Sequence, residues 1–394
     1  MANGKPSTVL SGADRLAREA EAYLGGKRIG LLTNPTGITR DFRSTLDVCA
    51  EQTAGKLTAL FACEHGIRGE RQAGLLFEDE TDPALGIPVY SLYGKHRAPT
   101  PEMLDTVDAI VFDIQDLGVR FYTYLTTLLY TMQACAKANK ELIVLDRPNP
   151  LGGLTVEGGV LRDGFQSMVG CWQVPFRTGM TIGEFARLAN DQSAVPCALQ
   201  VVPLEGWRRD MEYPATGLPW VMPSPNMPTM DTVRVYSGTC LFEGTNLSEG
   251  RGTTRPFEMI GAPWLDGRAV AEAMNRQGLP GVKFQPVYFT PMFSKHKGEL
   301  CGGVQLYVRE PGIYEAVRSG LYLLAHIREL HPDHFAWLPP FKEGSKSFIQ
   351  LLTGSDTVPD TLRGPADAER IAGEWEREAA AWSKTREPYL LYEH

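Results

Sequence analysis

The sequence predicts an α/β fold: a Rossmann-like, mostly parallel sheet with a second, smaller α+β domain. Strand-length apolar segments alternate with helix-length segments through the first 200 or so residues, as parallel crossovers require. The apolar runs are continuous, which is typical of strands covered on both faces. With 394 residues the chain exceeds one comfortable core. We therefore expect a first domain over residues 1–209 and a second over 210–394.

Each expected element of the first domain has its own local signal. Continuous apolar runs predict strands at residues 28–33, 57–63, 87–92, 110–113 and 142–146. Apolar residues on one helical face predict helices at 44–52 and 124–139. Pro101 near a helix start predicts a short helix at 101–107. Thr181 and Glu184 form a capping-box pattern that opens a helix ending near Asn190.

The second domain has weaker signals. Proline and glycine become dense after about residue 203, and residues 238–261 are rich in glycine and polar side chains. Such stretches favour long functional loops. Beyond them we expect a strand at 304–309 and helices at 313–330 and 365–384.

Composition excludes several classes of protein. A net charge of −8 disfavours nucleic acid as a partner, and no apolar stretch is long enough for membrane insertion. The seven cysteines are scattered and never spaced as Cys-x-x-Cys, so neither a disulfide framework nor a zinc knuckle is expected. The start of the chain lacks an apolar signal core, which indicates the cytoplasm for the sequence as given, or the periplasm or secretion if an export signal was removed. No motif indicates an oligomeric state.

Cofactor motifs are missing from the sequence. There is no Gly-x-Gly-x-x-Gly after the first strand, no Walker A loop, no Gly-x-Ser-x-Gly elbow and no His-Glu-x-x-His pair. We expect no cofactor and no metal. The chemistry is left to carboxylates, tyrosines, arginines and histidines.

Carboxylates end three of the predicted strands. Glu64, Asp113 and Asp146 each follow an apolar run, and parallel winding brings such ends to one sheet edge, where ligands bind. Glu64 is followed by His65 and a glycine, as a catalytic loop requires. Burial disfavours the charged form of a carboxyl group, so we expect Glu64 to be protonated. The plain alternative is a surface glutamate in a turn.

Other candidates have structural alternatives. One of Asp113 and Asp116 is expected to cap the following helix while the other faces a cleft. The turn at residues 146–150 suits sugar hydroxyls, and an internal salt bridge is its alternative. The loop at 246–254 is either solvated or a carboxylate cradle around Arg251. We expect this loop to face the cleft that contains Glu64.

Seven long segments resemble one bacterial family. They cover residues 32–37, 64–69, 113–124, 146–150, 223–228, 242–252 and 301–305. They are similar to the NamZ-type exo-β-N-acetylmuramidases, formerly a domain of unknown function, and the resemblance spans Gly26 to Tyr392. It implies a Rossmann-like first domain, a smaller second domain and an active cleft between them. It also implies a glycoside hydrolase that releases N-acetylmuramic acid from non-reducing ends of peptidoglycan fragments, so its partner is a peptidoglycan-derived sugar or muropeptide.

Glycoside hydrolysis assigns roles to these residues. Glu64 is expected to be the general acid. Asp116 or Asp146 then activates water, or the substrate's acetamido group is the nucleophile, steadied by a carboxylate, Tyr122 or Tyr124. The expected catalytic set is Glu64, Asp116 and Tyr124. Expected substrate contacts are His65, Arg68, Asp113, Gln115, Arg120, Tyr122, Asp146, Arg147, Asn149, Asn226, Asn246, Glu249 and Arg251.

One arginine is expected to bind the lactyl carboxylate of N-acetylmuramic acid. Arg251 is the first candidate and Arg68 the second, because arginine binds a carboxylate with two parallel hydrogen bonds. Two rival functions remain. One is a non-catalytic, two-lobed protein that binds muropeptides or sugars. The other is a nucleotide- or phosphate-dependent enzyme, which the missing glycine motif disfavours.

Overall fold

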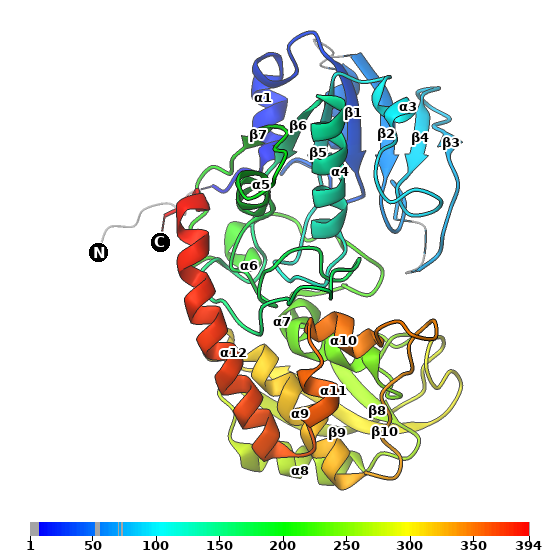
Figure 1. Ribbon diagram of the computed structural model, residues 1–394, viewed down its shortest axis with the longest axis vertical. Coiled ribbons are helices and arrows are strands. Elements are labelled where there is room, and N and C mark those ends of the chain that lie inside the picture. Colours follow the sequence, from blue (N-terminus) through cyan, green and yellow to red (C-terminus); the bar gives the residue numbers. More distant parts are fainter. Residues whose placement is uncertain (1–7, 52–55, 70, 72–73, 394) are drawn as a thin grey trace.

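A seven-stranded sheet forms the centre of the first lobe in the computed structural model, which describes residues 8–51, 56–69, 71 and 74–393 (Figure 1). Its strand order is β3-β4-β2-β1-β5-β6-β7. Six strands run parallel: β4 (Pro88–Ser91), β2 (Lys56–Ala62), β1 (Arg28–Thr33), β5 (Ala109–Asp113), β6 (Glu141–Leu145) and β7 (Ala198–Val202). The short β3 (Glu80–Thr81) is antiparallel to β4. The predicted mostly parallel sheet is confirmed.

Helices cover both faces of this sheet. On one face lie α1 (Gly12–Leu24) and α2 (Thr45–Glu51), and on the other lie α3 (Pro101–Leu104), α4 (Tyr124–Ala138) and α5 (Ile182–Asp191). Alternate residues of β5 point to opposite faces, so Ile110 and Phe112 join one buried cluster and Val111 joins the other. The predicted capping box at the start of α5 is present, with the Thr181 side chain accepting from the Glu184 amide.

A three-stranded antiparallel sheet supports the second lobe, in the order β8-β10-β9. Its strands are β8 (Met259–Ala262), β9 (Val282–Phe289) and β10 (Cys301–Val308). Around it lie α7 (Met230–Thr239), α8 (Gly267–Gln277), α9 (Ala316–Leu330), α10 (Phe348–Thr353) and α11 (Thr357–Thr361). The short α6 (Tyr213–Thr216) precedes them, and 3₁₀ turns lie at η1 (Cys240–Gly244), η2 (Pro311–Ile313) and η3 (Glu387–Tyr389). The smaller α+β unit is therefore present.

One continuous apolar core joins the two lobes. The same buried cluster contains Phe112 of the large sheet, Phe242 of η1 and Leu324 of α9. Helix α12 (Pro365–Arg386) runs alongside both lobes and packs on α9 (Figure 1). At its end, Arg386 donates to backbone carbonyls of the first lobe. The lobes therefore share core residues as well as chain connections.

Candidate active site

A cavity of about 1200 Å³ lies between the lobes at the carboxyl edge of the large sheet. The first lobe contributes Glu64, Tyr93 and Arg97 to its wall, and the second contributes Glu249 and Arg251. The volume exceeds that of a typical small-ligand pocket, so an extended ligand fits. Its lining mixes aromatic rings with charged side chains, as sugar sites require.

Glu64 is fixed at the first-lobe wall of this cavity. It follows β2 at the sheet edge and is 9% exposed. One carboxyl oxygen accepts from the Gly74 amide at 3.1 Å, and the other accepts from the Thr123 hydroxyl at 2.9 Å. Because both oxygens are held, the carboxyl group keeps one orientation toward the cavity. Such a fixed carboxyl suits proton transfer to a bound sugar.

The backbone after Glu64 turns sharply. His65 adopts a left-handed conformation with φ 77°, and Gly66 follows at φ 78°. The His65 ring lies 2.9 Å from the Arg71 carbonyl oxygen through Nδ1 and also lines the cavity. This contact ties the loop to itself, so His65 has a structural role as well as a place at the site.

Two tyrosines at the start of α4 line the cavity and differ in the hydrogen bonds of their hydroxyl groups. Tyr122 and Tyr124 pack edge to face at 4.9 Å, and burial raises the pKa of both hydroxyls well above the ordinary value. The Tyr124 hydroxyl accepts from the Asn34 amide and donates to the Pro223 carbonyl. The Tyr122 hydroxyl is buried with no hydrogen-bond partner among the residues described. Both Tyr124 bonds are therefore to the protein, whereas the Tyr122 hydroxyl lies beside Ser224, which lowers its pKa against the effect of burial.

The second-lobe loop predicted to face this cavity does so. Arg251 lies 3.3 Å from a Glu243 oxygen and 3.2 Å from a Glu249 oxygen. Lys295 lies 2.9 Å from Glu249. The Arg251 guanidinium also stacks over Phe257, 5.0 Å from the ring centroid. The two carboxylates hold the pKa of Arg251 above its ordinary value despite burial. This ion-pair cluster builds the second-lobe wall.

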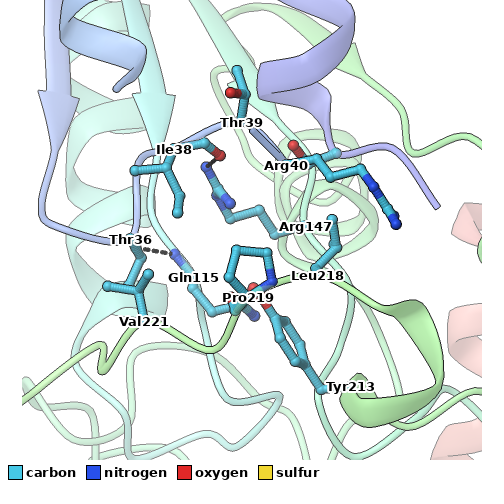
Figure 2. Close-up of a pocket in the computed structure, with 11 residues that line it drawn as sticks. Thr36, Ile38, Thr39, Arg40, Gln115, Arg147, Tyr213, Leu218, Pro219 and Val221 are labelled. Carbon is cyan, nitrogen blue, oxygen red and sulfur yellow. Dashed lines mark hydrogen bonds between the residues drawn. The ribbon is translucent and has the colours of Figure 1, made fainter. Parts of the chain in front are cut away.

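Asp113 and Arg147 form an internal salt bridge at the sheet edge. Arg147 donates to the two Asp113 oxygens at 2.6 and 2.8 Å, and Thr45 donates to Asp113 as well. Arg147 also lines a separate pocket of about 10 Å³, which is too small for a sugar. Figure 2 shows Arg147 there with Gln115 and Tyr213. Neither Asp113 nor Arg147 lines the large cavity. The salt bridge expected as the alternative for the 146–150 turn is therefore present through Arg147. The expectation that Asp113 or Asp116 caps the following helix is wrong, because the N-cap residue of α4 is Thr123.

Asp146 is also committed to the fold. It accepts from the Thr181 hydroxyl at 2.7 Å and the Gly183 amide at 2.8 Å, and Tyr392 donates to it from the end of the chain. Burial raises the pKa of Asp146 to about 7. The strand ends of Glu64, Asp113 and Asp146 thus share one sheet edge, but of these three carboxyl groups Glu64 alone lines the cavity.

Several other predicted site residues have structural roles, because their side chains bond to other parts of the protein. Arg120 donates to the Gly159, Val174 and Leu352 carbonyls, and Asn149 donates to the Met180 carbonyl. Asn246 is bonded to the backbone of His334 and Ala336. Gln115 donates to the Asp116 and Pro148 carbonyls, and Arg68 pairs with the buried Asp82 at 2.8 Å.

Asp116 is buried outside the cavity lining. One of its oxygens accepts from the Gly118 amide at 2.6 Å, and the other has no hydrogen-bond partner among the described residues. Burial raises the pKa of Asp116 to about 7. Of the predicted site residues, the cavity is lined by Glu64, His65, Tyr122, Tyr124, Asn226, Glu249 and Arg251.

The sequence reasoning did not select several lining residues. Tyr93 and Arg97 follow β4, so the strand-end rule that selected Glu64 applies to them equally. Glu243 lies within a segment that carried the resemblance, but it was not singled out. Nothing in the local sequence near Lys295 indicates its contact with Glu249. Among the described residues, no group of three or more metal-ligating side chains comes together.

Comparison with known proteins decides the family. The profile of the N-terminal part of exo-β-N-acetylmuramidase NamZ matches residues 29–231, and the profile of its C-terminal part matches residues 234–392. The chain belongs to the NamZ family. The two profiles adjoin between residues 231 and 234, while the boundary at 209/210 stays a prediction.

Similar proteins align with this NamZ family chain over nearly its whole length. It is 45% identical over 388 residues to the peptidoglycan β-N-acetylmuramidase NamZ of Bacillus subtilis strain 168, covering 98% of this chain and 92% of the relative. Two solved structures of DUF1343 family proteins from Bacteroides fragilis share its fold. One is 36% identical with a TM-score of 0.89, and the other is 30% identical with a TM-score of 0.79. Each comparison covers 98% of this chain and 99% of the other.

Proposed function

We propose that this NamZ family protein is a glycoside hydrolase that releases N-acetylmuramic acid from the non-reducing ends of peptidoglycan fragments. The observation that carries the proposal is Glu64, a carboxyl group held by two donors and directed into a cavity of about 1200 Å³. The 45% identity to a peptidoglycan β-N-acetylmuramidase supports the substrate class. No helix among the described residues is long and apolar enough to cross a membrane.

We assign proton donation to Glu64. As the bond between the sugar C1 and the glycosidic oxygen breaks, Glu64 passes its proton to that oxygen, and the shortened fragment leaves as an alcohol. The cavity is lined by three carboxyl groups from the described residues, Glu64, Glu243 and Glu249, and the latter two are paired with cations. Among the described residues, no second unpaired carboxylate is therefore available to stabilise the oxocarbenium-like centre.

We assign the second role to the substrate's own acetamido group. Its carbonyl oxygen bonds to C1 from the opposite face and forms a cyclic oxazolinium ion, a recognised exception to the two-carboxylate scheme. Water then adds to C1, the ring opens, and Glu64 recovers a proton from that water. Tyr122 lines the same cavity as Glu64, and we assign its hydroxyl to hydrogen bonding with the acetamido group.

Two displacements at C1 retain its configuration. We expect the first-formed product to be β-N-acetylmuramic acid, and NMR during the first minutes of turnover detects the anomeric proton directly. Initial formation of the α-anomer would contradict the acetamido assignment and require a water-activating base, while leaving Glu64 as the acid.

The function is tested with two isomeric disaccharides. One has N-acetylmuramic acid at the non-reducing end, and the other has N-acetylglucosamine there. We expect the protein to release N-acetylmuramic acid from the first and to leave the second intact. Binding of the first disaccharide without any turnover would instead support the non-catalytic sugar-binding protein.

A further inference from the structure

The cations that line the cavity are not all paired with a carboxylate of the described residues. Arg97, Arg251 and Lys295 are the cations among its described lining residues. Arg251 and Lys295 are matched by Glu243 and Glu249, at distances of 2.9 to 3.3 Å. Two cations therefore meet two carboxylates on the second-lobe wall. This wall has no spare positive charge for an anionic substrate.

Arg97 is the cation left over on the first-lobe wall. Its guanidinium stacks on the Tyr93 ring, 4.3 Å from the centroid, and it forms no ion pair with a carboxylate of the described residues. Its Nη1 atom is buried and has no hydrogen-bond partner among the described residues. Burying a guanidinium nitrogen without an acceptor is costly unless a ligand supplies one.

Tyr93 connects Arg97 to the catalytic carboxyl group. Burial and the nearby Glu64 together raise the pKa of Tyr93 to about 12, against the opposing effect of Arg97. All three side chains line the same cavity. A sugar whose C1 faces Glu64 therefore presents its ring substituents toward Tyr93 and Arg97.

N-acetylmuramic acid differs from N-acetylglucosamine by a lactyl ether on O3 that ends in a carboxylate. Among the described residues that line the cavity, Arg97 is the cation with no carboxylate ion-pair partner, so it is available to one substrate carboxylate. A guanidinium binds a carboxylate with two parallel, charge-assisted hydrogen bonds. Arg251 and Arg68, the residues expected from the sequence to read this group, are already paired with protein carboxylates.

We propose that Arg97 binds the lactyl carboxylate and thereby sets the preference for N-acetylmuramides over N-acetylglucosaminides. This inference rests on the proposed function. Arg97 is a specificity residue in this account, and Tyr93 holds its guanidinium plane in place.

The test compares a chromogenic β-N-acetylmuramide with its lactamide, in which the carboxylate is replaced by an uncharged amide of nearly equal size. Arg97→Ala should lower kcat/KM for the muramide about 10- to 100-fold and change kcat/KM for the lactamide by less than about threefold. Arg97→Lys should recover part of the loss, because a point charge replaces the two-point contact. Free guanidinium ion should restore part of the muramide activity of Arg97→Ala.

Lys137→Ala is the matched control. Lys137 is an exposed cation of α4 that lines a neighbouring surface pocket together with Arg97 but does not line the cavity. Its removal lowers the positive charge of the surface equally and should leave the ratio of the two substrates unchanged.

Two results would overturn the inference. One is an equal loss on both substrates in Arg97→Ala, which would make Arg97 a support for Tyr93 and Glu64 only. The other is an unchanged kcat/KM for the muramide in a folded Arg97→Ala protein. Failure of the wild-type protein to cleave either substrate would instead refute the proposed function.

Discussion

At the scale of single residues, the same chemical groups serve catalysis and folding, and burial with pairing separates the two uses. Asp113 and Glu64 both follow buried strands, but Asp113 is fully buried and paired with Arg147, whereas Glu64 faces the cavity. A buried pair is weak support for stability, yet breaking it leaves an uncompensated charge.

The Asp113–Arg147 pair gives a stability prediction with an internal control. Arg147→Ala should lower the free energy of unfolding by about 3–5 kcal/mol, because the Asp113 carboxylate is left buried without its partner. Arg28→Ala breaks the Arg28–Asp108 pair at the start of β1 and β5, where both side chains are more than 40% exposed. That change should cost less than about 1 kcal/mol. Urea titrations of both variants check the contrast, and similar costs would contradict it.

Asp116 gives a pH prediction. Its folded-state pKa is about 7 because of burial, whereas an unfolded aspartate titrates near its ordinary value of 3.8. Between these values the folded protein binds more protons than the unfolded chain, so this residue makes stability fall as pH rises from about 4 to 7, with no further change above 7. Asp116→Asn should flatten that part of the stability curve by a few kcal/mol. Urea titrations at pH 4.5 to 8 measure it, and parallel wild-type and variant curves would refute it.

At the scale of elements, the sequence signal was strong where apolar patterns are continuous. The predicted strands at 28–33, 57–63, 110–113 and 142–146 coincide with β1, β2, β5 and β6 within one residue at each end. These strands are buried on both faces, so their apolar runs are uninterrupted. Helix α1 was missed although its signal exists, since Ser11 and Asp14 form a capping box and Leu16 and Ala20 are buried.

Other elements depend on contacts that the local sequence does not contain. Helix α7 carries β-branched residues and a glycine, and Val233, Tyr236 and Gly238 are buried where α7 packs against α9. At β9, exposed residues interrupt the apolar pattern, and its ladder to β10 holds it in the sheet. Whether a carboxylate at a strand end is available for catalysis also depends on contacts with residues that are distant in the sequence. Asp146 is occupied by Tyr392, 246 residues away along the chain.

Helix α12 should stabilise the arrangement of the two lobes. The Arg386 guanidinium donates through Nη1 to the carbonyls of Gly153, Thr178 and Gly179 at 2.7 to 3.0 Å. Arg386→Ala should lower the free energy of unfolding by about 2–4 kcal/mol, since several buried carbonyl groups lose a charged donor. The control is Arg370→Ala on the outer side of α12, where the 3.1 Å pair with Glu374 is exposed. That change should cost less than about 0.5 kcal/mol, and equal costs in thermal unfolding would contradict a clamp at Arg386.

At the scale of the whole molecule, the shared core predicts a single unfolding transition. The larger apolar cluster extends through both lobes, and Arg120 of the first lobe donates to the Leu352 carbonyl of α10 at 2.9 Å. Neither lobe can unfold without exposing the core of the other. Differential scanning calorimetry should give one peak with equal calorimetric and van't Hoff enthalpies. Two resolved transitions would contradict a shared core.

The shared core also bears on how the cavity works. A binding protein that closes over its ligand by a hinge needs lobes with few core contacts between them. Here the core is continuous and α12 runs along both lobes, so the cavity walls hold their positions before substrate arrives. Fixed groups suit catalysis, because stabilising groups that are already in place cost no reorganisation during the reaction.

The central claim is that Glu64 supplies the proton for cleavage, and Glu64→Gln tests it most directly. Glutamine keeps the shape of the side chain. Its oxygen can accept from the Gly74 amide and its NH2 group can donate to the Thr123 hydroxyl oxygen, but it cannot donate an acidic proton. With the disaccharide that carries N-acetylmuramic acid at its non-reducing end, the account predicts a fall in kcat of about 100-fold or more with binding by calorimetry within about threefold of wild type. Turnover within about threefold of wild type in the folded variant would contradict the claim.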